Sequence, residues 1–188
     1  MTGLFGGAFD PPHVGHLALA RAAKEHFALS RLTILVTEHP GHKEAHLPAE
    51  ERLELARAAF PADDVRLDPY PRTIDLLRAE RFDDPVFIVG ADQFSSFLSW
   101  KEPDEVLEHA RLAVATRPGY PREALDAVLE QLDQPERVVF FDLEPNPAAS
   151  REIRALIEAG APLTGLVPSA VADRIRSRGL YVRDPGLH

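Results

Sequence analysis

The stretch LFGGAFDPPHVGH, residues 4–16, decides how the rest of the chain is interpreted. It extends a short apolar run and holds two glycines, two prolines and two histidines within thirteen residues. Gly6 and Gly7 carry no side chains, so backbone N–H groups can approach an anion there and positive φ angles are permitted. The helix that follows adds free N–H donors and a partial positive charge at its N-terminus. The pattern favours a phosphate site between a first strand and a first helix.

The two histidines of this stretch are three residues apart. If the helix begins near Pro12, His13 and His16 share one face, and both imidazoles can donate to phosphoryl oxygens. Asp10 and Pro11 form the turn that presents the first histidine. Two other interpretations stay open: one histidine caps the helix while the other packs, or the pair binds a metal.

Apolar runs alternate with helical patterns along the chain. Strands are predicted at 2–6, 32–37, 65–68, 86–90, 112–116 and 138–143. Helices are predicted at 14–27, 48–60, 73–80, 103–110, 121–132, 150–160 and 168–179. This alternation predicts an α/β fold, a Rossmann-like doubly wound and mainly parallel sheet with C-terminal helices, in a single domain over residues 1–188. Such sheets bind ligands at the carboxyl ends of their strands, where the strand order reverses.

The composition limits the classes of function. Apolar residues make up 45% and charged residues 27% of the 188 residues, which is typical of a globular protein. No apolar run approaches the roughly 20 residues of a membrane helix, and no signal peptide is expected. The chain has no cysteine, which fits a cytoplasmic location. A net charge of −9 argues against nucleic-acid binding, so any phosphate must be held by a local site.

Three polar or aromatic positions each allow a binding role and a structural role. Asp92 follows the most apolar strand, where a carboxylate suits a ribose hydroxyl or caps the next helix. Trp100 is the only tryptophan, and it can stack on a pyridine ring or pack in the core. Thr73 heads its helix, whose N–H donors can bind a carboxylate, or it serves as the N-cap.

Two further segments carry basic residues and histidines. Ser150 is the predicted N-cap of its helix, and Arg154 one turn later either binds phosphate or lies at the surface. Lys43 is either a solvated loop lysine or a phosphate ligand. A transition-metal site on the same loop is a weaker alternative, built from His39, His42 and His46.

The motif GGAFDPPHVGH resembles the signature of the nucleotidylyltransferase superfamily, a His-x-Gly-His after the first strand. Further motifs resemble the bacterial nicotinate-nucleotide adenylyltransferases, and the match runs in order over nearly the whole chain. They are HPGHK (39–43), RTIDLL (72–77), FIVGADQFSSFLSW (87–100), SREIR (150–154) and LVPSAVADRIRSRGLY (166–181).

The resemblance implies adenylyl transfer from ATP to nicotinate mononucleotide, with Mg²⁺ as the partner of ATP. His13 and His16 would hold the α-phosphate, and Lys43 and Arg154 the β- and γ-phosphates. The remaining ATP-binding positions would be Gly6, Gly7, Ala8, Phe9, Gly90, Asp92 and Ser150. The nicotinate-nucleotide positions would be Thr73, Asp75 and Trp100. A homo-oligomer is one option for the assembly.

The chain departs from the family's pattern at a few places. Ala8 stands where threonine is usual, Arg72 and Leu76 replace a tyrosine and a threonine, and Arg151 replaces a threonine. Because backbone donors carry much of such binding, we expect the changes to be tolerated, although they leave room for altered specificity.

Three alternatives follow for the function. The first is a sister enzyme that uses nicotinamide mononucleotide or phosphopantetheine, although phosphopantetheine enzymes usually have threonine where His13 stands. The second is a non-catalytic nucleotide sensor, which the altered positions favour and the intact His13, His16 and Lys43 oppose. The third is a metal-binding protein built on the histidine-containing loop.

Overall fold

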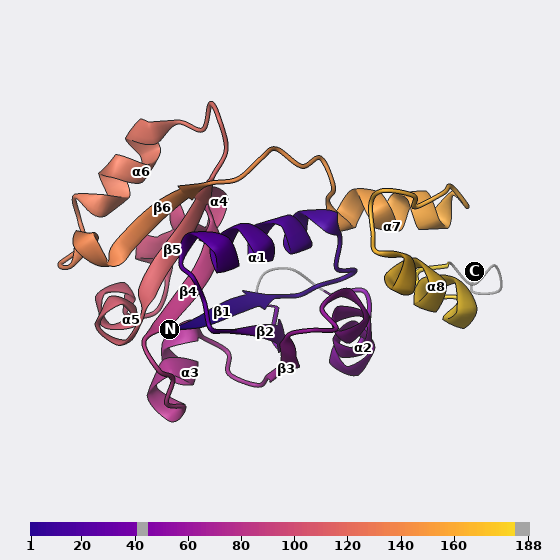
Figure 1. Cartoon of the computed structure of the whole chain (residues 1–188), viewed down its shortest axis with the longest axis horizontal. Coiled ribbons are helices and arrows are strands. Elements are labelled where there is room, and N and C mark those ends of the chain that lie inside the picture. The colour runs from indigo at the N-terminus through magenta and orange to yellow at the C-terminus, as the bar shows by residue number, and fades with distance from the viewer. Residues whose placement is uncertain (41–44, 183–188) are drawn as a thin grey trace.

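The chain folds around one six-stranded parallel sheet. The computed structural model describes residues 1–40 and 45–182. The strand order is β3-β2-β1-β4-β5-β6, and each pair of neighbours is parallel (Figure 1). The strands are β1 (Thr2–Gly7), β2 (Arg31–Thr37), β3 (Asp64–Asp68), β4 (Pro85–Gly90), β5 (Arg111–Thr116) and β6 (Val138–Asp142). The predicted doubly wound α/β fold is confirmed, with every strand within one residue of its predicted bounds.

Helices connect the strands and cover both faces of the sheet. They are α1 (Val14–His26), α2 (Ala49–Ala59), α3 (Thr73–Ala79), α4 (Ala91–Phe94), α5 (Pro103–His109), α6 (Arg122–Leu129), α7 (Ser150–Glu158) and α8 (Ser169–Arg178). Two short 3₁₀ helices, η1 (Phe97–Ser99) and η2 (Pro135–Arg137), were not predicted, and neither was α4 as a separate helix. No helix in the described part of the chain is long and apolar enough to cross a membrane.

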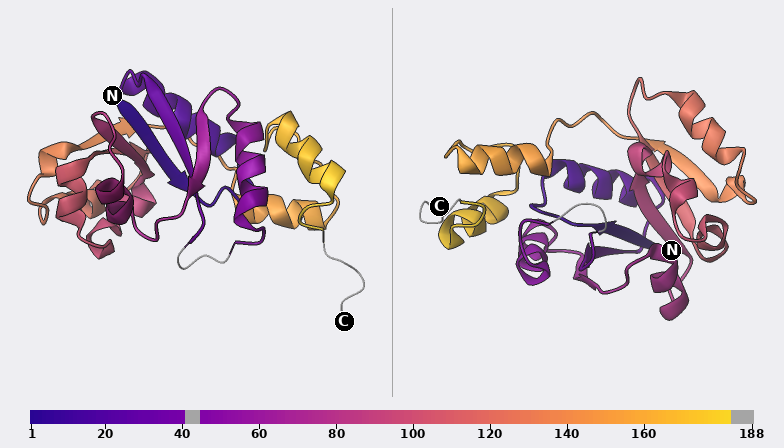
Figure 2. Two further views of the ribbon diagram at one scale, coloured as in Figure 1. Left: turned by 90° about the horizontal axis from the view of Figure 1, so that it is seen from below. Right: turned by 180° about the vertical axis from the view of Figure 1, so that it is seen from behind.

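The strand side chains alternate between two apolar layers. In β4, Val86 and Ile88 face the layer that α1 and α2 cover, whereas Phe87 and Val89 face the layer formed with α3 to α6. All four side chains are buried, which explains why the sequence of this strand is apolar throughout. Helices α7 and α8 extend the first layer beyond the sheet, with α8 beside α2 (Figures 1 and 2).

The order of the strands fixes where a ligand can bind. The chain runs from β1 outward to β2 and β3, and then returns to β4 on the other side of β1. The connections that leave β1 and β4 therefore diverge, and a crevice is expected between their carboxyl ends. Gly6 and Gly7 end β1 at this point, and the turn of residues 8–13 and the start of α1 follow them.

A buried arginine ties the loops at this edge of the sheet together. Arg52 of α2 is 1% exposed. Its Nη1 donates to the carbonyl oxygens of Ala8 and Thr37, both at 2.8 Å, and its Nε donates to that of Leu47 at 3.0 Å. One guanidinium thus satisfies backbone acceptors after β1, at the end of β2 and before α2.

Replacing Arg52 with methionine should lower the free energy of unfolding by about 3 kcal/mol or more, because three buried carbonyls lose their donor. Arg57→Met is the matched control, since Arg57 lies exposed on the same helix and pairs only with Glu54. The control should cost less than about 1 kcal/mol. Urea unfolding measures both, and equal midpoints would contradict the role given to Arg52.

Candidate active site

The end of β1, at Gly6 and Gly7, is shaped by close packing rather than by the backbone angles that glycine permits. Gly6 and Gly7 do not use the positive φ angles that glycine permits; the residue of this stretch with positive φ is Phe9, at 49°. An added Cβ would lie 3.3 Å from the Phe87 ring at Gly6, and 3.2 Å from the Phe9 ring at Gly7. The glycines therefore let two aromatic rings approach the end of β1.

The two signature histidines hold each other at the N-terminus of α1. His13 is the N-cap, one residue before the helix, and its Nδ1 accepts from the N–H of Gly15 at 3.2 Å. The N–H of His13 donates in turn to Nδ1 of His16 at 3.1 Å. The ring centroids are 3.8 Å apart, and the His16 ring packs 5.0 Å from that of Phe9. The Nδ1 atom of each ring is therefore used as an acceptor for a backbone N–H group at the start of the helix.

The glycine between the histidines has a steric reason. A Cβ at Gly15 would lie 3.0 Å from the His13 ring, closer than ordinary van der Waals contact. The His13 ring can fold back over the first turn of the helix only because that side chain is absent.

Burial determines the charge of the two imidazoles, and these hydrogen bonds determine their tautomer. Burial lowers the pKa of His13 to about 4. Burial, and then the charge of His13, lower the pKa of His16 well below its ordinary value. Both rings are therefore neutral at pH 7, and because each Nδ1 accepts a hydrogen bond, the single proton lies on Nε2. The pair carries two Nε2–H donors.

Helix α7, from the C-terminal part of the chain, donates hydrogen bonds to the turn of residues 8–13, called the signature turn below. Arg154 donates from Nη1 to the carbonyl of Asp10 at 2.5 Å, and the Ser150 hydroxyl donates to that of Pro11 at 2.9 Å. Ser150 is not the N-cap that the sequence predicts: Ala149 holds that position, and Ser150 is the first helical residue. The structure thus brings Ser150 and Arg154 beside the stretch that carries the histidines.

The predicted nicotinate-nucleotide positions lie around the start of α3 and the end of η1. Asp75 pairs with Lys101 at 2.7 Å, which ties α3 to the residue after Trp100. Trp100 is partly buried, with its ring edge-on to Phe87 and Phe97 at 6.2 and 5.2 Å between centroids. Thr73 is the first residue of α3, and Arg72, rather than Thr73, is its N-cap.

The end of β4 supplies a carboxylate and a basic neighbour. Gly90 is the N-cap of α4, so Asp92 lies within the first turn and is not the predicted N-cap. Its carboxylate is exposed and lies 3.8 Å from the Arg117 guanidinium after β5. The sequence analysis missed Arg117, although an arginine directly after an apolar strand signals a charge at this edge.

Two sequence hypotheses involve residues 41–44. Lys43 and His42 lie outside the described residues. His39 is exposed, and its N–H donates to the Thr37 hydroxyl; the His46 N–H donates to the Asp10 carboxylate. No group of three metal-binding side chains occurs among the residues that the structure describes.

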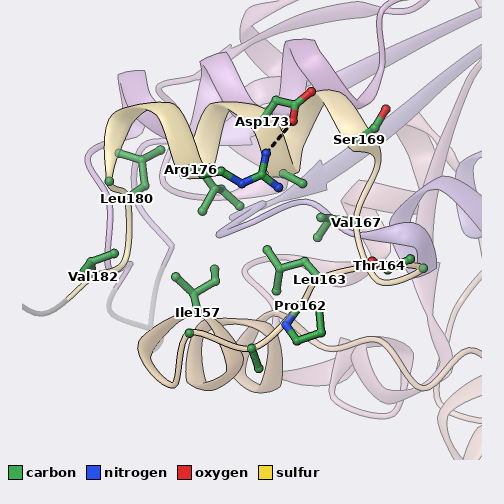
Figure 3. Close-up of a pocket in the computed structure, with 16 residues that line it drawn as sticks. Ile157, Pro162, Leu163, Thr164, Val167, Ser169, Asp173, Arg176, Leu180 and Val182 are labelled. Atoms are coloured by element: carbon green, nitrogen blue, oxygen red, sulfur yellow. Dashed lines mark hydrogen bonds and ion pairs between the residues drawn. The ribbon is translucent and has the colours of Figure 1, made fainter.

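A separate apolar pocket of about 760 Å³ lies between α7 and α8 (Figure 3). Its walls include Ile157, Leu163, Val167, Ile175 and Leu180. None of the residues discussed above as phosphate or nucleotide ligands lines it, so the candidate active site is defined by the strand ends rather than by this pocket.

The fold and the site define a class: a doubly wound α/β protein of the nucleotide-binding type, with two imidazole N–H donors at the turn after its first strand. The cytidylyltransferase-like family model matches residues 4–156. The chain belongs to this family of nucleotidyltransferases and, within it, to the nicotinate-nucleotide adenylyltransferases.

Similar proteins of known name support this assignment. The nicotinate-nucleotide adenylyltransferase named in Thermus thermophilus is 38% identical, over 95% of this chain and 98% of its own. The one named in Rubrobacter xylanophilus is 36% identical, over 97% and 92%. The fold is similar to that of Plasmodium falciparum nicotinic acid mononucleotide adenylyltransferase complexed with NaAD, with a TM-score of 0.76, 14% identity and 96% of each chain covered.

The lowered histidine pKa values predict acid-labile folding. In the unfolded chain a histidine has a pKa near 6.5, so between that pH and about 4 the unfolded state takes up a proton that folded His13 does not bind. The stability is full above pH 6.5 and falls as the pH drops toward 4, by on the order of 3 kcal/mol from His13 alone. Urea unfolding at several pH values measures this loss.

His13→Asn is the matched variant, because asparagine caps a helix well and does not titrate. It should show a smaller loss of stability between pH 6.5 and 4 than the original chain. Carboxylates contribute equally to both proteins. The same pH slope in both would show that His13 is not the titrating group.

Proposed function

We propose that this chain transfers the adenylyl group of ATP to nicotinate mononucleotide, giving deamido-NAD and pyrophosphate. The observation that carries the proposal is the pair of neutral imidazoles in contact at the N-terminus of α1, with their Nε2–H groups left over after capping. The membership in the nicotinate-nucleotide adenylyltransferases and the position at the strand-order reversal support the same reaction.

The chemistry requires alignment and charge stabilisation. An oxygen of the 5′-phosphate of nicotinate mononucleotide attacks the α-phosphorus of ATP, a new P–O bond forms, and the bond to the bridging oxygen breaks with release of pyrophosphate. The nucleophile is already an anion, so no general base is needed. His13 and His16 donate from Nε2 to the α-phosphoryl oxygens as charge builds on them. By analogy with oxyanion-hole donors, each contributes about 2.7–4 kcal/mol.

The pyrophosphate side is assigned to Arg154 and Lys43. Arg154 uses one N–H on the Asp10 carbonyl, and a guanidinium carries five N–H donors, so further donors remain for the β- and γ-phosphates. Lys43 follows from the sequence alone. The backbone of Gly6, Gly7, Ala8 and Phe9 lies beside the same phosphates, and Ser150 fixes the turn.

The acceptor side is assigned to the start of α3 and to Trp100. The first N–H groups of α3, beginning at Thr73, would receive the nicotinate carboxylate, and Asp75 holds Lys101 so that Trp100 is kept in place. The exposed face of Trp100 stacks on the pyridine ring. Gly90 and Asp92, at the end of β4, would take the ribose of ATP.

Magnesium fits this site as the partner of ATP. The buried carboxylate of the signature turn, Asp10, is occupied by the Tyr181 hydroxyl and the His46 N–H, and the other groups near the phosphates are imidazoles and a guanidinium. Mg²⁺ would therefore be held by phosphate oxygens and water, and its chemistry would be to neutralise the charge of the leaving pyrophosphate.

We place this reaction in the cytoplasm.

His16→Ala should lower kcat by two orders of magnitude or more, because it removes a donor to the transition state. His26→Ala is the matched control, since His26 is an exposed histidine on the same helix. Pyrophosphate release with ATP, Mg²⁺ and nicotinate mononucleotide measures both. An active His16→Ala enzyme would contradict the assignment of the signature histidines.

The same assay identifies the acceptor. We expect release with nicotinate mononucleotide and little with nicotinamide mononucleotide or phosphopantetheine. Release with another acceptor would keep the chemistry and change the substrate. No release with any acceptor, from folded protein that still binds ATP, would favour the nucleotide sensor.

Trp100→Ala should raise the KM for nicotinate mononucleotide about tenfold or more and change the KM for ATP little, because ring stacking is lost on the acceptor side only. Trp100→Phe keeps an aromatic face and should restore much of the affinity. Since Trp100 is the only tryptophan, quenching of its fluorescence by the acceptor is an independent test. Equal effects on both substrates would place Trp100 outside the acceptor site.

A further inference from the structure

Three distant segments meet at one buried carboxylate. Asp10 is 4% exposed. Its Oδ1 accepts from the Tyr181 hydroxyl at 2.7 Å, and its Oδ2 accepts from the backbone N–H of His46 at 2.6 Å. Asp10 belongs to the turn after β1, His46 to the segment before α2, and Tyr181 to the segment after α8. Each carboxylate oxygen thus receives a hydrogen bond from a different part of the chain.

The end of α8 directs Tyr181 toward this carboxylate. Leu180 and Val182, on either side of it, line the apolar pocket between α7 and α8 (Figure 3). The Tyr181 hydroxyl instead reaches Asp10. Tyr181 has a φ of 63°, a conformation that residues other than glycine rarely adopt. Burial and the Asp10 carboxylate raise the pKa of Tyr181, so its hydroxyl stays protonated and donates.

The surroundings of Asp10 compensate its charge. Burial lowers the pKa of the Arg52 guanidinium, and the charge of the Asp10 carboxylate opposes that shift. Arg154 donates to the backbone carbonyl of the same aspartate. His46 adds its imidazole, with Nδ1 at 3.6 Å from Oδ2. Asp10 is therefore the centre of a polar cluster beneath the signature turn.

The cluster is coupled to the histidines through a stiff connection. Only Pro11 and Pro12 separate Asp10 from His13, and proline rings fix φ. A displacement of Asp10 is therefore transmitted to the N-cap of α1. On the other side, the bond to the His46 N–H holds the segment before α2.

We propose that Tyr181 is a positioning residue that acts through Asp10: its hydroxyl fixes the carboxylate, and the carboxylate fixes both the turn that presents His13 and the segment at His46. The last described turn of the chain thereby completes the active site without touching the substrates. The catalytic part of this proposal rests on the proposed function.

Tyr181→Phe tests the hydroxyl while keeping the ring. We expect kcat to fall about tenfold, the effect of losing a hydrogen bond to a charged group, with the KM values for ATP and nicotinate mononucleotide within about twofold. Tyr120→Phe is the matched control, because it removes a tyrosine hydroxyl that bonds to Ser95; its kcat should be unchanged. Assays run well below the thermal midpoint of each variant. A lowered midpoint with unchanged kcat would reduce Tyr181 to a stabilising role and overturn the proposal.

A double-mutant cycle with Asp10→Asn tests the route of the effect. If Tyr181 acts through Asp10, the double variant should be no slower than Asp10→Asn alone. Multiplying effects would show that Tyr181 acts independently, which overturns the proposal.

Amide hydrogen exchange tests the coupling without catalysis. Tyr181→Phe should speed exchange at His46 and over residues 8–16 by about tenfold, and Tyr120→Phe should not. Unchanged exchange would overturn the proposal. If the original chain released no pyrophosphate with any acceptor, the proposed function would fail, and the exchange experiment would still decide whether Tyr181 holds the turn.

Discussion

The site depends on a pair of hydrogen bonds from the backbone to imidazole rings at the start of α1. A helix N-terminus leaves N–H groups without partners, and here the ring nitrogens of His13 and His16 accept two donors, the N–H groups of Gly15 and His13. That requirement fixes the tautomer of both rings, since an accepting Nδ1 leaves the proton on Nε2. The hydrogen bonds that satisfy the backbone N–H groups thus leave two Nε2–H groups as donors that can bind an anion.

The position of the imidazole pair depends on the turn that precedes it in the chain. The Phe9 ring of that turn packs in the apolar core, and buried polar groups bind the backbone carbonyls of the turn. Arg52 takes the carbonyl of Ala8, Arg154 takes that of Asp10, and Ser150 takes that of Pro11. The donors come from α2 and α7, so the position of the histidines depends on where both helices lie beside the turn.

The sequence predicted the sheet well because its strands are apolar on both faces, as in β4, and the glycine turn marked the end of the first strand. It predicted less well what depends on contacts between distant residues. Nothing near Tyr181 in the chain signals that its hydroxyl reaches Asp10, and Arg52 looked like one arginine among many on an ordinary helix. Ser150 was expected to cap its own helix, yet its hydroxyl donates to the backbone carbonyl of Pro11. The caps were misplaced by one or two residues because capping depends on backbone angles that residue types only bias.

The structure shows what the residues do at the positions where the chain departs from its family's pattern. Ala8 contributes a carbonyl to Arg52, which any residue supplies. Arg72 caps α3 through its backbone, and its exposed side chain donates to the carbonyl of Pro71. Leu76 is buried in the core, and Arg151 is exposed. Since these side chains make none of the described bonds that hold the histidines, we expect the changes to leave the two imidazole donors in place and to act, if anywhere, on the fit of the acceptor.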